Sequence, residues 1–241
     1  MPTRARFQGT WFGARQNHSH RNLRDCVNLA LFDFDGTITF KDSFAPFVYL
    51  VVSPARAGIG GVLLLPVIVG YKAGTVSAST TRSAVAWCAL KGRAESEIRD
   101  AGARYARDVL PRIIRRKAMQ RIDWHKARGD AVVVVSAALD AYLRPWCAAL
   151  ELSVICTELE VRDGRLTGRY KGGDCVGPEK RRRIEANYRL TDFTSIYAYG
   201  DTIEDQQMLS LADHKYFRWR EVGGPIQQRR KSDHVDEVVG R

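Results

Sequence analysis

A buried strand that runs directly into two aspartates constrains the fold of this chain more than any other feature. Residues 27–40 read VNLALFDFDGTITF, where the apolar run ends at Asp33, Asp35 and a turn with Gly36. Such a run is typical of a parallel strand covered on both faces, and chemistry in these sheets lies beyond the carboxyl ends of the strands. Two carboxylates one residue apart are costly unless they share a cation. The stretch therefore indicates a metal and an anionic substrate.

The rest of the chain divides into a helical block and a strand–helix alternation. Residues 41–128 are predicted to be almost entirely helical, with one helix at 76–90 and another following the spacing of Ile98, Ala101 and Tyr105. The β-branched run 131–135 is predicted to be the second strand, ending at Ser136. Further strands are expected at 153–156, 194–199 and 215–219, a hairpin at 159–169, and helices at 139–150, from 178 and at 203–211. This alternation predicts an α/β fold with a doubly wound parallel sheet.

Polar residues from separate segments are expected at the same edge of that sheet. They are the DFDGT turn at 33–37, Ser136, Lys180 and the GDTIED stretch at 200–205. In this order, they resemble the motifs of the haloacid dehalogenase superfamily. The helical insertion resembles the cap of its subfamily IB, the branch that contains phosphoserine phosphatase. The resemblance implies a Rossmann-like core at 26–40 and 129–241 and an inserted helical cap domain at 41–128.

The resemblance also implies an Mg²⁺-dependent phosphatase. Asp33 would attack a phosphate monoester to form an aspartyl-phosphate, and Asp35 would act as general acid and then as general base. The residues expected to bind the substrate phosphate are Thr37, Ser136, Ala137 and Lys180. The expected Mg²⁺ ligands are Asp33, the backbone carbonyl of Asp35, Asp201 and Asp205, the last either directly or through water. For Lys180, a solvated helix face shared with Arg181–Arg183 would explain the residue equally well.

Two departures from the phosphoserine phosphatase pattern bear on the substrate. Asp42 stands where those enzymes have a glutamate that contacts the substrate amine, so it is expected to bind substrate here. The shorter acid, together with GDTIEDQQML in place of a GDGxND form, counts against phosphoserine itself. A helix cap would account for Asp42 as well as substrate contact does.

An uncharged apolar segment inside the predicted cap indicates either a buried helix or a membrane contact. Residues 57–71 are shorter than the roughly 20 residues that span a bilayer, contain Pro66, and are flanked by Arg56 and Lys72. A full span would need extension back through 47–52. This segment, WCALKGR at 87–93 and HKYFRWR at 214–220 resemble the C-type phosphatidylglycerophosphatases. That resemblance implies a phospholipid headgroup as substrate and peripheral membrane contact through 57–71; a small soluble phosphate ester is the alternative.

Charge and cysteine content bear on partners and location. The formal net charge of +11 favours anionic partners, which also admits a non-catalytic basic protein that binds nucleic acid or anionic membrane. The arginines of 112–121 lack an accompanying nucleic-acid motif, so no specific nucleic-acid partner is expected. Residues 1–25 are expected to form a basic, disordered tail without the apolar core of a secretory signal. The scattered cysteines fit reduced thiols, which predicts a cytoplasmic location, with the inner face of the membrane as the alternative.

Overall fold

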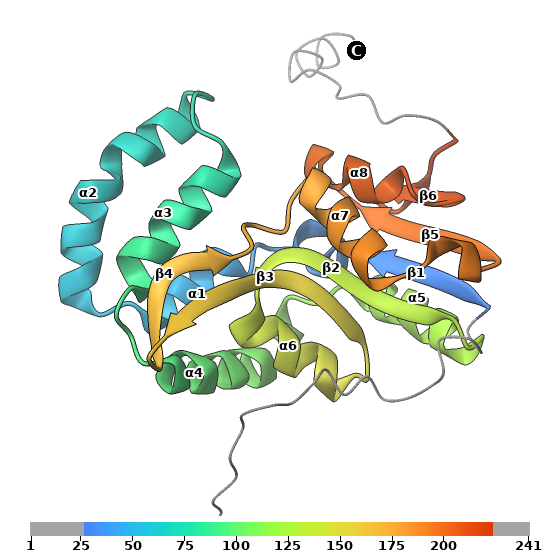
Figure 1. Ribbon diagram of the computed structural model, residues 1–241, viewed down its shortest axis with the longest axis horizontal. Coiled ribbons are helices and arrows are strands. Elements are labelled where there is room, and N and C mark those ends of the chain that lie inside the picture. Colours follow the sequence, from blue (N-terminus) through green and yellow to red (C-terminus); the bar gives the residue numbers. More distant parts are fainter. Residues whose placement is uncertain (1–26, 224–241) are drawn as a thin grey trace, which may run out of the picture.

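A seven-stranded sheet lies at the centre of the computed structural model, which describes residues 27–223 (Figure 1). The predicted basic tail at 1–25 therefore falls outside the described residues. The strand order is β4-β3-β2-β1-β5-β6-β7. The strands are β1 (Asn28–Phe32), β2 (Ala131–Leu139), β3 (Ser153–Arg162), β4 (Arg165–Lys171), β5 (Ser195–Gly200), β6 (His214–Phe217) and β7 (Arg220–Glu221).

The first strand occupies the middle of the sheet. β1 pairs in parallel with both β2 and β5, β3 and β6 extend the parallel region, and β4 and β7 add antiparallel edges. Every residue of β1 is buried, as expected for a strand covered on both faces. The turn that follows it, η2 (Phe34–Ile38), therefore lies at the centre of the carboxyl edge. The predicted α/β class with a Rossmann-like core is confirmed.

Helices cover both faces of this sheet (Figure 1). Along β1, Ala30 and Phe32 pack into one core cluster with α4, α5 and α6, whereas Leu29 and Leu31 pack into a second cluster with α7 and α8. The helices are α1 (Phe44–Val51), α2 (Pro54–Lys72), α3 (Ala78–Leu90), α4 (Glu95–Asp108), α5 (Arg116–Ala127), α6 (Asp140–Ala149), α7 (Pro178–Asn187) and α8 (Gln206–Leu209). The short turns are η3 (Leu110–Arg112), η4 (Leu190–Asp192) and η5 (Ile203–Asp205).

The segment predicted to be a helical cap is helical, but part of it packs against the helices and strands of the core. α4 packs against α6, and α5 packs against β2. By contrast, α2 and α3 form a helical hairpin that projects beyond β4 (Figure 1). The division of the chain into cap and core at residues 41 and 128 stays a prediction.

Three predicted strand boundaries are wrong. β2 continues past Val135 to Leu139, because it keeps pairing with β3 through a register shift. The short strand at 153–156 and the first arm of the hairpin are one continuous strand, β3. The last predicted strand ends at Phe217, because Arg218 and Trp219 adopt positive φ angles of 52° and 66° and turn the chain into β7.

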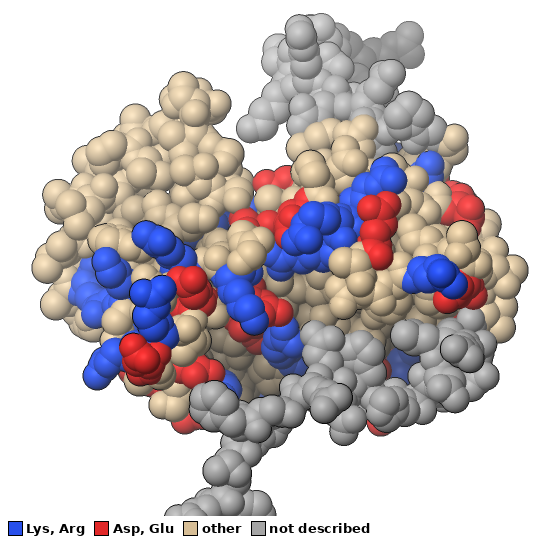
Figure 2. All heavy atoms as spheres, viewed as in Figure 1, with Lys and Arg blue, Asp and Glu red and all other residues tan. Residues whose placement is uncertain are grey.

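The apolar segment forms α2, and the expectation of a buried cap helix is wrong. Gly60 is its one buried residue, while Val62 is 75% exposed. Figure 2 shows an uncharged surface over the upper part of α2 and α3 on the face in view, with basic side chains near the lower end of this hairpin. Extension back through 47–52 does not occur, because α1 ends at Val51 and Ser53 caps the start of α2. Of the described residues, α2 provides the one helix long and apolar enough to cross a membrane, with a mean hydropathy of 1.4.

Candidate active site

A buried ion-pair network joins Asp33 to Lys180 at the carboxyl edge of the sheet. The backbone N–H of Asp33 donates to the carbonyl of Tyr199, which holds the start of the turn against β5. Lys180 Nζ donates to Asp33 Oδ1 at 2.5 Å and to Asp205 Oδ1 at 2.6 Å. Its side chain is 2% exposed, whereas that of Arg182 on the same helix is 65% exposed. The solvated-face explanation for Lys180 is therefore wrong.

Asp205 and Thr37 hold the loop that carries Asp201. Asp205 Oδ2 accepts from the backbone N–H groups of Asp201 and Thr202, both at 3.0 Å, and from the Thr202 hydroxyl. The Thr37 hydroxyl donates to Asp201 Oδ1 at 3.1 Å. The Thr37 hydroxyl thus positions Asp201, and its contact with phosphate stays a prediction.

The acidic cluster fits a magnesium ion. Oxygen atoms of Asp33, Asp201 and Asp205 lie within 4.8 Å of one another, and oxygen-only ligands suit Mg²⁺. Burial and the neighbouring Asp205 raise the pKa of both Asp33 and Asp201. Burial would also raise the pKa of Asp205, but Lys180 outweighs it and lowers that pKa. One ammonium thus faces three carboxylates, and a divalent cation would offset the remaining repulsion.

Asp35 is held apart from this cluster. Its carboxylate accepts from Ser43 twice, from the backbone N–H at 2.9 Å and from the hydroxyl at 3.0 Å. Ser43 is itself held by the hydroxyls of Tyr142 and Tyr105. Burial raises the pKa of Asp35 to about 7, and Asp42 adds to the rise. A carboxyl group with that pKa can give and take a proton near neutral pH, while its backbone carbonyl stays the expected Mg²⁺ ligand.

A cavity of about 300 Å³ opens over these groups. Its lining includes the predicted site residues Asp33, Asp35, Asp42, Ser136, Ala137, Lys180 and Asp205, but not Thr37 or Asp201. The Ser136 hydroxyl accepts from the Ala138 N–H at 3.1 Å. Asp42 Oδ2 accepts from the Ala45 N–H at 2.8 Å, so Asp42 caps the start of α1; its contact with substrate stays a prediction.

Sequence reasoning missed two residues that shape this cavity. Arg82 of α3 forms ion pairs with Asp174 at 3.0 Å and Glu204 at 3.3 Å, and so ties the helical hairpin to the loops beside the site. No local pattern marks Arg82, because its partners are far away in the chain. Ser43 follows Asp42 and precedes a helix, which indicates a cap and not the role of holding Asp35.

Residues 30–210 match the family described as haloacid dehalogenase-like hydrolase. The chain belongs to this family. The expectations of the superfamily and of a hydrolase are thereby confirmed. The haloacid dehalogenase-like hydrolase is 32% identical to Protein CicA of Caulobacter vibrioides over 196 residues, which cover 79% of this chain and 85% of CicA.

Solved structures show the same fold. A protein of unknown function from Bordetella pertussis Tohama I has a TM-score of 0.65 and 24% identity, with 80% of this chain and 90% of that chain covered. A phospho-aspartyl intermediate analogue of phosphoserine phosphatase has a TM-score of 0.55 and 23% identity, with 80% and 86% covered. The assignments to subfamily IB and to a phosphatidylglycerophosphatase-like group stay predictions.

In this hydrolase, Gly36→Ala is expected to weaken Mg²⁺ binding by about 10–100-fold, as loss of a supporting contact to a ligand does. Gly36 has a φ of +88°, and a Cβ there would overlap the Asp201 carboxylate. A matched control is Gly164→Ala at the hairpin tip, where φ is +72° and nothing lies within 4 Å of the added Cβ. Both variants bear the backbone strain, so isothermal titration with Mg²⁺ isolates the displacement of Asp201. Equal affinities in the two variants would contradict the placement of Asp201 as a ligand.

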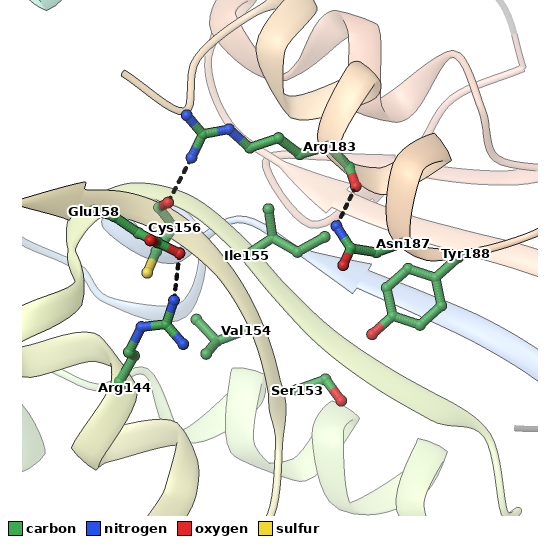
Figure 3. A pocket seen from close by; sticks show the side chains of 9 residues that line it. All are labelled: Arg144, Ser153, Val154, Ile155, Cys156, Glu158, Arg183, Asn187 and Tyr188. Carbon is green, nitrogen blue, oxygen red and sulfur yellow. Dashed lines mark hydrogen bonds and ion pairs between the residues drawn. The ribbon is translucent and has the colours of Figure 1, made fainter. Parts of the chain in front are cut away.

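A second polar cavity, of about 80 Å³, lies against β3 and α7 (Figure 3). Its charged groups are engaged with the protein: Arg183 donates to the Cys156 carbonyl at 2.7 Å, and Arg144 donates to Glu158 at 2.5 Å. This space is small beside the roughly 300–1,000 Å³ of typical ligand sites. The candidate active site is therefore the larger cavity at the carboxyl edge.

Proposed function

We propose that this hydrolase is an Mg²⁺-dependent phosphatase that cleaves a phosphate monoester through an aspartyl-phosphate on Asp33. The observation that carries the proposal is that two carboxyl groups of one turn have different surroundings. Asp33 is ion-paired with the buried Lys180, whereas Asp35 has a pKa of about 7 and lies on the same cavity. The two carboxyl groups have different partners, an ammonium for Asp33 and the Ser43 donors for Asp35, and this supports nucleophile and acid roles. Phosphoserine phosphatases among the structural neighbours are consistent with it.

The chain's own residues account for both steps of the reaction. The Asp33 carboxylate attacks phosphorus, and Asp35 protonates the leaving alkoxide as the P–O ester bond breaks. Asp35, now ionised, takes a proton from water, whose oxygen attacks the aspartyl-phosphate and releases inorganic phosphate and free Asp33. Lys180 of α7 supplies a fixed positive charge beside the phosphoryl oxygens, and Ser136 of β2 lines the same cavity. Bound Mg²⁺ would neutralise charge on those oxygens.

We propose a phospholipid headgroup, such as that of phosphatidylglycerophosphate, as the substrate of this phosphatase. Support comes from α2, which exposes several large apolar side chains between Arg56 and Lys72. Its exposed side chains include Ile59, Val62, Leu63, Leu65 and Val69. Such a surface flanked by cations supports a peripheral contact with an anionic membrane, and it agrees with the proposed location of a cytoplasmic protein at the inner face of the membrane. A small soluble ester resembling phosphoserine is the alternative, supported by the polar lining of the catalytic cavity.

A non-catalytic basic protein is less well supported. Several basic side chains of α5 are used within the fold: Lys117 lies over the ring of Trp219, and Arg121 lies over the rings of Trp124 and Tyr216. A surface that binds the phosphates of a nucleic acid or a membrane would instead present its cations to solvent. These contacts favour the enzyme.

The proposed function predicts Mg²⁺-dependent phosphate release with a preference for lipid esters. The test is a panel of phosphatidylglycerophosphate, lysophosphatidate, phosphoserine, sugar phosphates and nucleoside monophosphates, each with Mg²⁺ and with EDTA. We expect turnover in Mg²⁺ that EDTA abolishes, because the acidic cluster cannot hold substrate phosphate without a cation. Preference for a soluble ester would discard the lipid substrate and keep the mechanism. Absence of Mg²⁺-dependent turnover on every ester would overturn the phosphatase.

A further inference from the structure

A second large cavity joins the catalytic one. It has a volume of about 490 Å³ and lies between α1, α2 and α3. Asp42, Phe44 and Arg82 line both cavities, so the two spaces meet at these side chains. A ligand with its phosphate at Asp33 therefore has a direct path into the second cavity.

The lining of this cavity is mostly apolar. Its apolar residues come from all three helices and include Val48, Val52, Leu64, Ile68, Val85 and Ala89. The charged lining residues are engaged with the protein: Arg56 donates to the Lys91 carbonyl at 2.8 Å, Arg82 is ion-paired, and Asp42 caps α1. Because these groups already have hydrogen-bond or ion-pair partners within the protein, the cavity suits an uncharged apolar ligand and not a second anion.

Glycines of α2 make the space. Gly60 packs against α3, where an added Cβ would lie 3.6 Å from Cys88 Cβ. Gly61 also lines the cavity, but nothing lies within 4 Å of an added Cβ there. An apolar cavity that no side chain fills costs the fold its packing contacts, and a ligand of matching shape restores them.

We propose that the cavity between α1, α2 and α3 holds a single hydrocarbon chain of the phosphate ester that is cleaved at Asp33. This inference rests on the proposed function, since the phosphate end of the ligand defines where the chain begins. Arg82 and Asp42 lie where the polar linkage between phosphate and chain would pass. The volume falls within the roughly 300–1,000 Å³ of ligand sites. The absence of a side chain at Gly61 leaves space for the hydrocarbon chain of the ligand.

The experiment is a chain-length series of n-alkyl phosphates, from ethyl to decyl, below their micellar concentrations and in Mg²⁺. We expect kcat/KM to rise by about fourfold per added methylene until the cavity is filled, as burial of a methylene predicts. Gly61→Phe places a ring in the cavity and is expected to flatten the series. The matched control is Gly58→Phe on the same helix, because Gly58 does not line the cavity and nothing lies within 4 Å of its added Cβ. It should keep the full chain-length dependence.

Each contrary result has a distinct meaning. The proposed hydrocarbon site is overturned if kcat/KM of the wild type does not change with alkyl chain length, or if both variants lose this dependence equally. Turnover of ethyl phosphate would still support the phosphatase. If no ester is cleaved, the phosphatase fails, and calorimetric binding of decyl phosphate against ethyl phosphate decides the chain site. Tighter binding of decyl phosphate with a negative heat-capacity change, lost in Gly61→Phe, supports it. Equal binding overturns it, as does vesicle binding through α2 without any preference for chain length.

Discussion

Asp33→Asn is expected to lower kcat/KM for phosphate monoesters by about 10³-fold or more, the scale seen when a covalent nucleophile is removed. An amide cannot form the aspartyl-phosphate, and it also removes one of the two carboxylates paired with Lys180. The fold should persist, because Asn has nearly the same shape and Lys180 keeps its hydrogen bond to Asp205. Phosphate release in Mg²⁺ measures the loss, and intact-mass spectrometry of acid-quenched reactions detects the phosphorylated protein.

The matched control is Asp163→Asn at the tip of the β3–β4 hairpin. Asp163 has a φ of 51°, a conformation that Asn tolerates, and lies far from the cavity in the chain topology. It should leave both turnover and the phosphorylated species unchanged. If Asp33→Asn kept a tenth or more of the wild-type rate, or still became phosphorylated, Asp33 would not be the nucleophile.

Lys180→Met is expected to destabilise the fold by about 3–5 kcal/mol, the cost of leaving a buried charge without its partner. The ammonium lies between Asp33 and Asp205, and both carboxylates would lose their cation in the low-dielectric interior. Activity should also fall by about 10²–10³-fold, because a fixed charge beside the phosphoryl oxygens is lost. Urea unfolding in EDTA measures the first effect, and phosphate release in Mg²⁺ measures the second.

The pH dependence of this variant gives a further check. In the wild type, Lys180 lowers the pKa of Asp205, so the ionised pair stabilises the fold above the pKa of the unfolded carboxyl group. That contribution is lost as the pH falls through the folded pKa. The stability gap between wild type and Lys180→Met should therefore narrow below about pH 4, where the unfolded carboxyl group also binds its proton.

Arg181→Met is the matched control for Lys180→Met. Arg181 is the next residue of α7, is 46% exposed, and pairs with Glu185 on the surface. A surface pair of this kind contributes about 0–1 kcal/mol, so the control should change little. Equal losses in the two variants would contradict a special role for the buried ammonium.

The central sheet and the edge that carries the site could be predicted because their signals are local. Residues 27–35 form an apolar run that ends in two aspartates, and the run at 131–135 is rich in β-branched residues. The composition of each run therefore predicts a buried strand. The turn at Asp163-Gly164 likewise reports a hairpin. In a parallel sheet, strand ends share an edge, which brings Asp33 and Ser136 to one cavity, and Lys180 reaches the same cavity from the start of α7.

Strand ends were less predictable, since pairing partners decide where a strand stops. β2 continues through Ser136 to Leu139 because β3 still offers hydrogen bonds beside it. The residues around Asp35 show the same limit. Ser43 reaches the Asp35 carboxylate, and Tyr142 reaches Ser43 from 99 residues away, so neither contact has a signature in the neighbouring sequence.

By itself, the sequence determined the approximate positions of the main strands along the chain, the acidic turn and the family motifs, because hydrophobic period and turn chemistry depend on neighbours in the chain. Only the tertiary structure decided that Lys180, the one of the basic residues 180–183 that the family motifs indicate, is buried against Asp33, 147 residues away, and is not part of a solvated helix face. It also decided that α2 exposes its apolar side chains and, with α1 and α3, encloses a cavity beside the active site. The physical reason is that burial and ion pairing depend on contacts between distant segments, which no local pattern contains.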